Sequence, residues 1–178
     1  MSECRIYVAS LADYNAGRLH GEWIDVTDPT TMRGEITAML AASPTAKEEG
    51  RQAEEWAVHD YEGFDGVRLS ETPDLETLCS ISEGVDEHGD AFLTWVGHDP
   101  NHNTDKTDFE EVYRGEFASL ADYVEDWWDQ SGWSESGEGW WHPSRYVDWE
   151  RMGHDLEMSG DIFTVDAPGG RVWVFDNH

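Results

Sequence analysis

Basic residues are scarce in this sequence. Among its 178 residues, 11 are Lys or Arg and 39 are Asp or Glu, so the formal net charge at pH 7 is −28. The only lysines are Lys47 and Lys106. Proteins that bind nucleic acid directly need a basic patch or stripe to meet the phosphates. These few bases form no such stripe, which argues against nucleic acid as a partner.

Long apolar runs and paired cysteines are missing too. No segment approaches the roughly 18 consecutive apolar residues of a membrane-spanning helix, and residues 1–21 lack the apolar centre of a signal peptide. Cys4 and Cys79 are far apart in the sequence and form no CxxC pair. A chain without a disulfide framework fits a reducing compartment. We therefore expect a cytoplasmic protein with no membrane partner.

Motifs of nucleotide binding and catalysis are also absent. Neither GxGxxG nor GxxxxGKS/T occurs. His98 and His102 stand four residues apart, but Pro100 between them opposes the helix that would join them in a zinc site. Cys79 falls in a helical apolar pattern, which favours a buried thiol over a catalytic one. We expect a protein that is not an enzyme and needs no cofactor.

Apolar residues are frequent enough to build a core. They make up 38% of the chain and include ten Trp, whereas disordered acidic segments are poor in aromatic residues. The pattern predicts an α+β protein made of three small domains. These are an α+β domain at 1–62, a small helical domain at 63–108, and an α+β domain with a dimer interface at 109–178.

Local patterns predict the individual elements. Runs rich in β-formers predict strands at 5–9, 22–26, 56–61, 112–117, 162–165 and 172–175. Apolar spacing and capping residues predict helices at 29–42, 72–82, 91–96, 119–128 and 143–160. Asp28-Pro29 and Thr72-Pro73 both have the form of a cap followed by proline at the first helical position. We expect Gly84 and Gly89 to interrupt the middle region, and loops at 10–21, 99–108 and 132–139; residues 46–55 fit a loop or a frayed helix.

The acidic residues are dispersed along the chain. The longest acidic run is two residues, unlike the blocks of a solvating tail. A DNA duplex carries one negative charge per about 1.7 Å, so the 28 net charges correspond to roughly 48 Å of duplex. Carboxylates fixed singly on a folded surface could therefore imitate phosphates. The residues expected on this partner-binding acidic face are Asp60, Glu62, Asp65, Glu83, Asp86, Glu87, Asp90, Asp122, Glu125, Asp126 and Asp129.

Aromatic residues are concentrated in the last third of the chain. Trp127-Trp128 and Trp133 lie there, together with a second Trp pair. Clusters of this kind belong more often to a core or an interface than to a recognition platform. We expect a homodimer, with an interface that includes Trp140, Trp141, Tyr146, Val147 and Trp149.

The stretch 99–110 supports an alternative function, a calcium-responsive acidic interaction module. Its oxygen-bearing side chains occupy loop positions 1, 3, 5, 7, 9 and 12 of an EF-hand. Thr104 stands where the sharp turn needs glycine, and Lys106 where an apolar residue normally packs. A polar linker rich in turn-forming residues is the competing interpretation. The candidate calcium ligands are Asp99, Asn101, Asn103, Asp105 and Glu110.

Three blocks of residues resemble the ArdA antirestriction proteins. The first is RIYVASLADYNAGRLHGEWIDV at 5–26, the second is EWAVHDYEG at 55–63, and the third runs from Tyr146 to Gly160. Acidic composition alone would also fit a protein from a salt-loving organism. The three blocks in their correct order favour the antirestriction family.

The resemblance implies a fold and a function. It implies an elongated, curved, three-domain protein that dimerises through its C-terminal domain and imitates bent B-form DNA. Such a protein occupies the DNA-binding groove formed by the specificity and modification subunits of a Type I restriction–modification enzyme. Its gene is implied to belong to a mobile genetic element. The family's antirestriction motif falls near 138–149, where this chain differs by its Trp140-Trp141 pair and a longer preceding loop.

Overall fold

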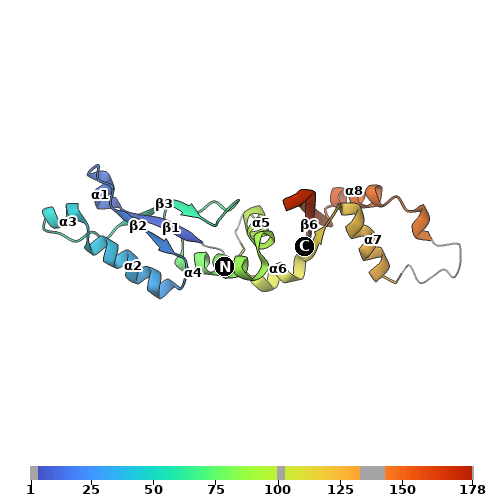
Figure 1. Ribbon diagram of the computed structural model, residues 1–178, viewed down its shortest axis with the longest axis horizontal. Helices are drawn as coiled ribbons and strands as arrows, with labels where there is room; N and C mark the ends of the chain where they lie inside the picture. Colours follow the sequence, from blue (N-terminus) through green and yellow to red (C-terminus); the bar gives the residue numbers. More distant parts are fainter. Residues whose placement is uncertain (1–3, 100–102, 133–142, 178) are drawn as a thin grey trace. The chain divides into compact units, whose positions relative to one another are not determined.

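The computed structural model describes residues 4–99, 103–132 and 143–177 (Figure 1). This part of the chain is α+β, with eight α-helices and two three-stranded antiparallel sheets, so the α+β part of the predicted fold class is confirmed. The chain divides into two compact units, Met1–Lys106 and Thr107–His178. No helix among the described residues is long and apolar enough to cross a membrane.

The first unit is built on a sheet of strand order β2-β1-β3. Its strands are β1 (Arg5–Ser10), β2 (Gly21–Asp25) and β3 (Trp56–Glu62), which confirms the three predicted strands. Tyr7 of the central strand pairs with Trp23 on one side and Asp60 on the other. After Tyr7 the register with β3 shifts, and the next pair joins Val8 to Val58. The shift is a β-bulge, which places one additional residue in β3.

Helix α2 (Pro29–Ala41) runs along this sheet (Figure 1). Its N-cap is Asp28, whose Oδ1 accepts hydrogen bonds of 3.0 Å from the amides of Thr30 and Thr31, as the Asp28-Pro29 pattern predicted. Met32, Ile36 and Met39 are buried on one side of the helix. The packed helix therefore closes one face of the sheet.

Helix α1 (Leu11–Asn15) was not predicted, and helix α3 (Pro44–Glu48) partly overlaps residues 46–55, for which a loop or a frayed helix was expected. The first lies in a stretch expected to be a loop. They are joined through the buried carboxylate of Asp13, which accepts hydrogen bonds from Ser43 Oγ (2.5 Å) and the Thr45 amide (2.9 Å). Burial alone would raise the pKa of Asp13, but these hydrogen bonds outweigh it and hold the pKa well below its ordinary value.

Helices α4 (Leu75–His88) and α5 (Asp90–His98) complete the first unit. The predicted start at Thr72-Pro73 was wrong, because Asp74 is the N-cap and its Oδ2 accepts from the Thr77 amide at 2.9 Å. Gly84 does not interrupt the helix. A Cβ at that position would lie 2.2 Å from the Phe92 ring, so this glycine permits close packing of the two helices. Gly89, with φ +68°, does separate them.

The second unit has the strand order β4-β6-β5. Helix α6 (Lys106–Val112) begins at the last residue of the first unit and continues into the second. The elements that follow are β4 (Tyr113–Phe117), α7 (Leu120–Gln130), a 3-10 turn η2 (Pro143–Tyr146), α8 (Trp149–Ser159), β5 (Ile162–Ala167), a 3-10 turn η3 (Pro168–Gly170) and β6 (Arg171–Asp176). The strands and α7 are confirmed. Helix α6 was not predicted. Helix α8 begins later than expected, because Asp148 caps it by accepting from the Arg151 amide at 3.0 Å. Of the expected loop at 132–139, residues 133–139 lie outside the described residues.

Candidate acidic interaction surface

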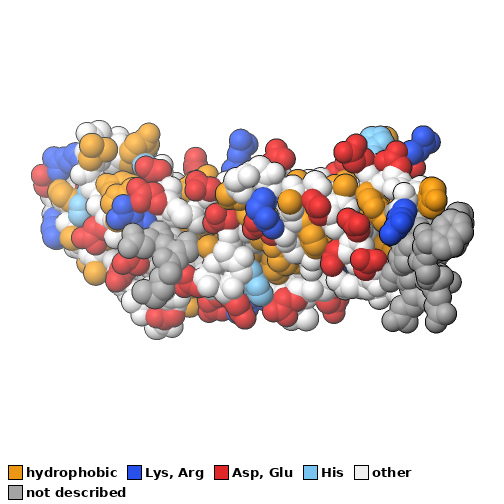
Figure 2. All heavy atoms as spheres, turned by 45° about the vertical axis from the view of Figure 1, so that its right-hand side comes forward, with side chains coloured by type: hydrophobic (Ala, Val, Ile, Leu, Met, Phe, Trp, Pro, Cys, Tyr) orange, Lys and Arg blue, Asp and Glu red, His pale blue; other side chains and the backbone are white. Residues whose placement is uncertain are grey.

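All eleven acidic residues predicted for the partner-binding face have exposed side chains. They form separate groups on the two units. The first unit carries Asp60 and Glu62 on β3, Asp65 just beyond it, Glu83, Asp86 and Glu87 on α4, and Asp90 at the start of α5. The other four lie on α7 of the second unit. In Figure 2, acidic side chains are spread over the visible face and outnumber basic ones.

The four acids of α7 share one face of that helix. Asp122, Glu125, Asp126 and Asp129 are spaced i, i+3, i+4 and i+7, which places them on one stripe of a helical surface. We name these four residues the α7 stripe. A rise of 1.5 Å per residue makes the stripe about 10.5 Å long. The structure thus brings together four of the predicted residues as a linear array of carboxylates.

Capping and packing fix the direction of the α7 stripe. Ser119 is the N-cap: its Oγ accepts from the Asp122 amide at 3.2 Å and donates to the Asp122 carboxylate at 2.6 Å. Tyr123 and Val124 are buried in the core of the unit. A Cβ on Gly153 of α8 would lie 2.8 Å from Leu120 Cγ, so this glycine lets α8 pack closely against α7. The apolar side of α7 faces inward, which leaves the acids in solvent.

Basic side chains form ion pairs with several of the predicted acids of the first unit. Glu62 is paired with Arg5 at 2.6 Å, and the Lys106 ammonium lies 3.0 Å from Glu87 and 3.7 Å from Glu83. The hydrogen bond and charge of Lys106 hold the pKa of Glu87 below its ordinary value.

Three members of the α7 stripe differ from these paired acids. Among residues that the structure describes, no basic group lies within 4.0 Å of Asp122, Glu125 or Asp126. Asp126 accepts a hydrogen bond from Gln130 at 2.6 Å, which leaves its charge intact.

The predicted calcium loop lies between α5 and α6. Asp99 Oδ2 accepts from the Asn103 amide at 3.1 Å, and Asn103 Oδ1 accepts from the Asp105 amide at 3.0 Å. These are hydrogen bonds that Asp and Asn make in turns. Glu110 lies on α6, and Asn101 is outside the described residues. Calcium binding stays a prediction.

The predicted dimer-interface residues have different environments. Tyr146 is 71% exposed, and Val147 is half-buried. Trp149 packs on the core of its own unit, with its ring centroid 5.7 Å from that of Trp128. Trp140 and Trp141 lie outside the described residues. Of the described candidates, Tyr146 therefore offers the most surface to a second copy.

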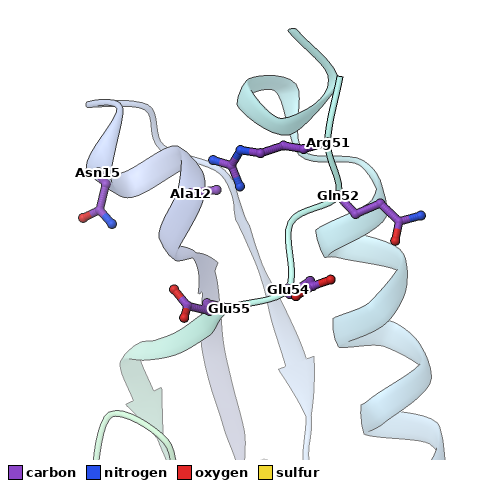
Figure 3. A pocket seen from close by; sticks show the side chains of 6 residues that line it. All are labelled: Ala12, Asn15, Arg51, Gln52, Glu54 and Glu55. Carbon is purple, nitrogen blue, oxygen red and sulfur yellow. The ribbon is translucent and has the colours of Figure 1, made fainter. Parts of the chain in front are cut away.

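A polar hollow of about 240 Å³ lies between α1 and the segment before β3 (Figure 3). It is lined by Ala12, Asn15, Arg51, Gln52, Glu54 and Glu55. Figure 3 shows the carboxylates of Glu54 and Glu55 directed away from each other. Arg51 is ion-paired with Glu49. These groups do not converge on one point, so the hollow lacks the arrangement of a nucleophile and its base.

One feature of the first unit was missed by the sequence analysis. Alternation along β1 and β2 puts Arg5, Tyr7, Trp23 and Asp25 on the same face of the sheet. The alternating pattern of each strand is visible in the sequence. The pairing of β1 with β2, which brings these residues together, is not.

Fold and surface together define a strongly acidic α+β protein with many exposed carboxylates, four of them in one stripe on α7. A family model described as antirestriction protein (ArdA) matches residues 6–168. The chain belongs to the ArdA antirestriction protein family, which confirms the resemblance. No curated protein matches the chain. Membership implies an antirestriction function, exerted as inhibition of restriction–modification enzymes.

Proposed function

We propose that this protein blocks restriction by imitating B-form DNA. It occupies the DNA-binding groove formed by the specificity and modification subunits of a Type I restriction–modification enzyme, acts without catalysis, and works in the cytoplasm where those enzymes meet DNA. The observation that carries the proposal is the α7 stripe. A single strand of B-DNA carries one charge per 3.4 Å of helix axis. The four charges of the α7 stripe are separated by three intervals along its length of about 10.5 Å. The average spacing is therefore about one charge per 3.5 Å.

The energetics of the stripe support a role in binding. Like charges at i, i+4 destabilise a helix by about 0.2–0.5 kcal/mol per pair. Asp122 and Asp126, and Glu125 and Asp129, are two such pairs in one short helix. The α7 stripe destabilises its own helix. A role of these carboxylates in binding a partner accounts for their presence. Contacts to phosphates carry no sequence information, and carboxylates in place of phosphates carry none either. The inhibitor is therefore expected to act on enzymes with different recognition sequences.

The proposed assembly is a homodimer of a three-domain chain. Its domains are 1–62, 63–108 and 109–178, and the last supplies the interface through Trp140, Trp141, Tyr146, Val147 and Trp149. The exposure of Tyr146 supports this assignment. Two copies double the number of carboxylates presented to one target, and the longer array covers more of the groove.

Competition with DNA tests the proposal. A Type I modification methyltransferase bound to a labelled duplex is titrated with the protein at two salt concentrations. We expect displacement at a near-stoichiometric ratio in low salt and weaker displacement in high salt, because counterions screen exposed charges. An unlabelled duplex serves as the reference competitor. If the labelled duplex stays bound at a large excess of protein in low salt, the proposal is wrong for this class of enzyme.

A further inference from the structure

One face of the β2-β1-β3 sheet carries aromatic and charged side chains. Ile6 and Val8, which point to the opposite face from Tyr7, are fully buried on the side covered by α2. The other face is formed by Arg5, Tyr7, Trp23, Asp25, Asp60 and Glu62, which pair across the three strands. We name these six residues the open sheet face. Trp23 remains 39% exposed there.

The centre of the open sheet face is aromatic. The ring centroids of Tyr7 and Trp23 are 5.6 Å apart, with an interplanar angle of 59°. A Cβ on Gly21 would lie 2.9 Å from both Cζ and Oη of Tyr7, so the tyrosine ring lies directly over the glycine backbone. The absence of a side chain at Gly21 therefore creates the space that Tyr7 fills. The result is a pair of adjacent, tilted aromatic rings on the surface of the sheet.

Arg5 already places a guanidinium on this surface. Its Cζ lies 4.8 Å from the ring centroid of Trp23, within the roughly 6 Å range of a cation–π interaction. Its Nε and Nη2 reach Glu62 Oε2 at 2.7 Å and 2.6 Å. One arginine thus makes both contacts that a guanidinium favours, a ring face and a carboxylate.

The open sheet face has acids beyond those that Arg5 engages. Asp25 is paired with Arg5 across β1 and β2, and Asp60 is paired with Tyr7 across β1 and β3. Both are exposed. Within the described part of the chain, neither forms an ion pair with a basic residue. Three carboxylates against one guanidinium leave the surface negative beside its aromatic rings.

We propose that the open sheet face binds arginine side chains of the protein partner. Trp23 and Tyr7 supply the stacking surface, and Asp25 and Asp60 supply carboxylates for the guanidinium. The inference rests on the proposed function, since a DNA-binding groove presents many basic residues. The proposed site prefers arginine to lysine, because a planar guanidinium stacks on an aromatic ring better than an ammonium does. Imitation of phosphates alone does not imply this preference. Arg5 competes with the incoming arginine for Trp23.

Calorimetric titration of the full-length protein with two peptides tests this proposal. The peptides are acetylated, amidated octa-arginine and octa-lysine, which carry equal charge. We expect octa-arginine to bind more tightly. Trp23→Leu is expected to reduce the affinity for octa-arginine by about two- to fivefold and to leave octa-lysine almost unchanged, as for an exposed cation–π contact. Circular dichroism verifies the fold of the variant.

Replacement of Arg5, which already contacts Trp23, gives a second measurement. Here we expect a gain in affinity for octa-arginine. Arg5→Gln should strengthen octa-arginine binding more than Arg18→Gln does. The two arginines are matched, because each is paired with a glutamate at 2.6–2.7 Å and their side chains are 40% and 42% exposed. Both variants lose one positive charge, so only the difference between them reports on Trp23. If Trp23→Leu does not fold, this comparison decides.

Three results would overturn the inference: equal affinities for the two peptides, equal gains from Arg5→Gln and Arg18→Gln, or preferential binding of a single-stranded oligonucleotide. Displacement of DNA from the methyltransferase is measured separately. A protein that displaces DNA without an arginine preference refutes the inference alone. A protein with a Trp23-dependent arginine preference that displaces no DNA refutes the proposed function alone.

Discussion

Neutralising the centre of the α7 stripe should weaken inhibition and stabilise the protein at the same time. The variant is Glu125→Gln combined with Asp126→Asn. The stripe contains four like-charge pairs at i, i+3 or i, i+4, and each pair includes Glu125 or Asp126. Gln and Asn differ little from Glu and Asp in helix propensity. Asn at 126 also keeps an oxygen that can accept the hydrogen bond from Gln130.

The expected gain in stability follows from the number of pairs. At about 0.2–0.5 kcal/mol for each pair, removal of four repulsions adds about 1–2 kcal/mol to the free energy of unfolding of the second unit. For a unit of this size, Thr107–His178, that gain raises Tm by about 4 °C or more. The gain should shrink in high salt, because the repulsion is already screened there.

The expected loss in binding follows from the exposed charges. An exposed ion pair contributes about 0.2–1 kcal/mol. Loss of two such contacts therefore raises the concentration needed for half-displacement of DNA by about 2- to 30-fold. The dependence of displacement on salt should also become less steep, since fewer charges take part.

Thermal unfolding and the methyltransferase competition assay are measured on the same preparations. The control is Glu157→Gln combined with Asp166→Asn, which makes the same change in net charge on exposed residues of α8 and β5. We expect the control to displace DNA almost as well as the unaltered protein. A stripe variant that is less stable in low salt refutes the repulsion argument. A variant that inhibits as well as its control refutes the role of the stripe.

Three further predictions concern stability. Ser43→Ala should cost about 1–3 kcal/mol in urea unfolding, since it removes a buried hydrogen bond to a carboxylate. The pKa of Asp13 is lowered by folding, so its contribution is present above the pKa of the unfolded chain and lost as pH falls; acid titration should show a smaller loss in the variant. Gly84→Ala should cost about 1–3 kcal/mol by overpacking, whereas Gly34→Ala, with nothing within 4 Å, should stabilise α2 by about 0.5–1 kcal/mol. Calcium should leave Tm unchanged, and a clear rise would favour the metal-binding alternative for 99–110.

Helix ends were predicted correctly where one capping residue dominated. Asp28 ranks above the neighbouring Thr27 as an N-cap and directly precedes Pro29, and α2 begins immediately after it. At the start of α4 the sequence offers Thr72-Pro73 and then Asp74. The structure uses Asp74, which also accepts from the hydroxyl of Thr77 at 3.0 Å. Asp ranks above Thr as an N-cap, so the stronger cap determined where the helix begins.

The missed elements depend on contacts between distant residues. Helices α1 and α3 have five residues each, which is too short to show a helical repeat in the sequence. Helices of this length are also unstable alone. They form because Asp13 of one meets Ser43 and Thr45 of the other. Gly84 has the same kind of explanation, since its role depends on a ring from the next helix. The exposed acids of α7 could be predicted, because helical spacing alone puts them on one face.

The placement of the few bases explains how the fold tolerates so much negative charge. Three of the ion pairs are Arg5–Glu62 between β1 and β3, Arg33–Glu76 between α2 and α4, and Arg171–Glu116 between β6 and β4, at 2.5–2.7 Å. Exposed pairs of this kind add little stability each, so their number cannot offset the total repulsion. Their position matters more, because each neutralises an acid where two elements meet. Among the residues that the structure describes, Asp122, Glu125 and Asp126 of α7 have no basic group within 4.0 Å, so these three carboxylates keep the charge that a cationic groove would attract.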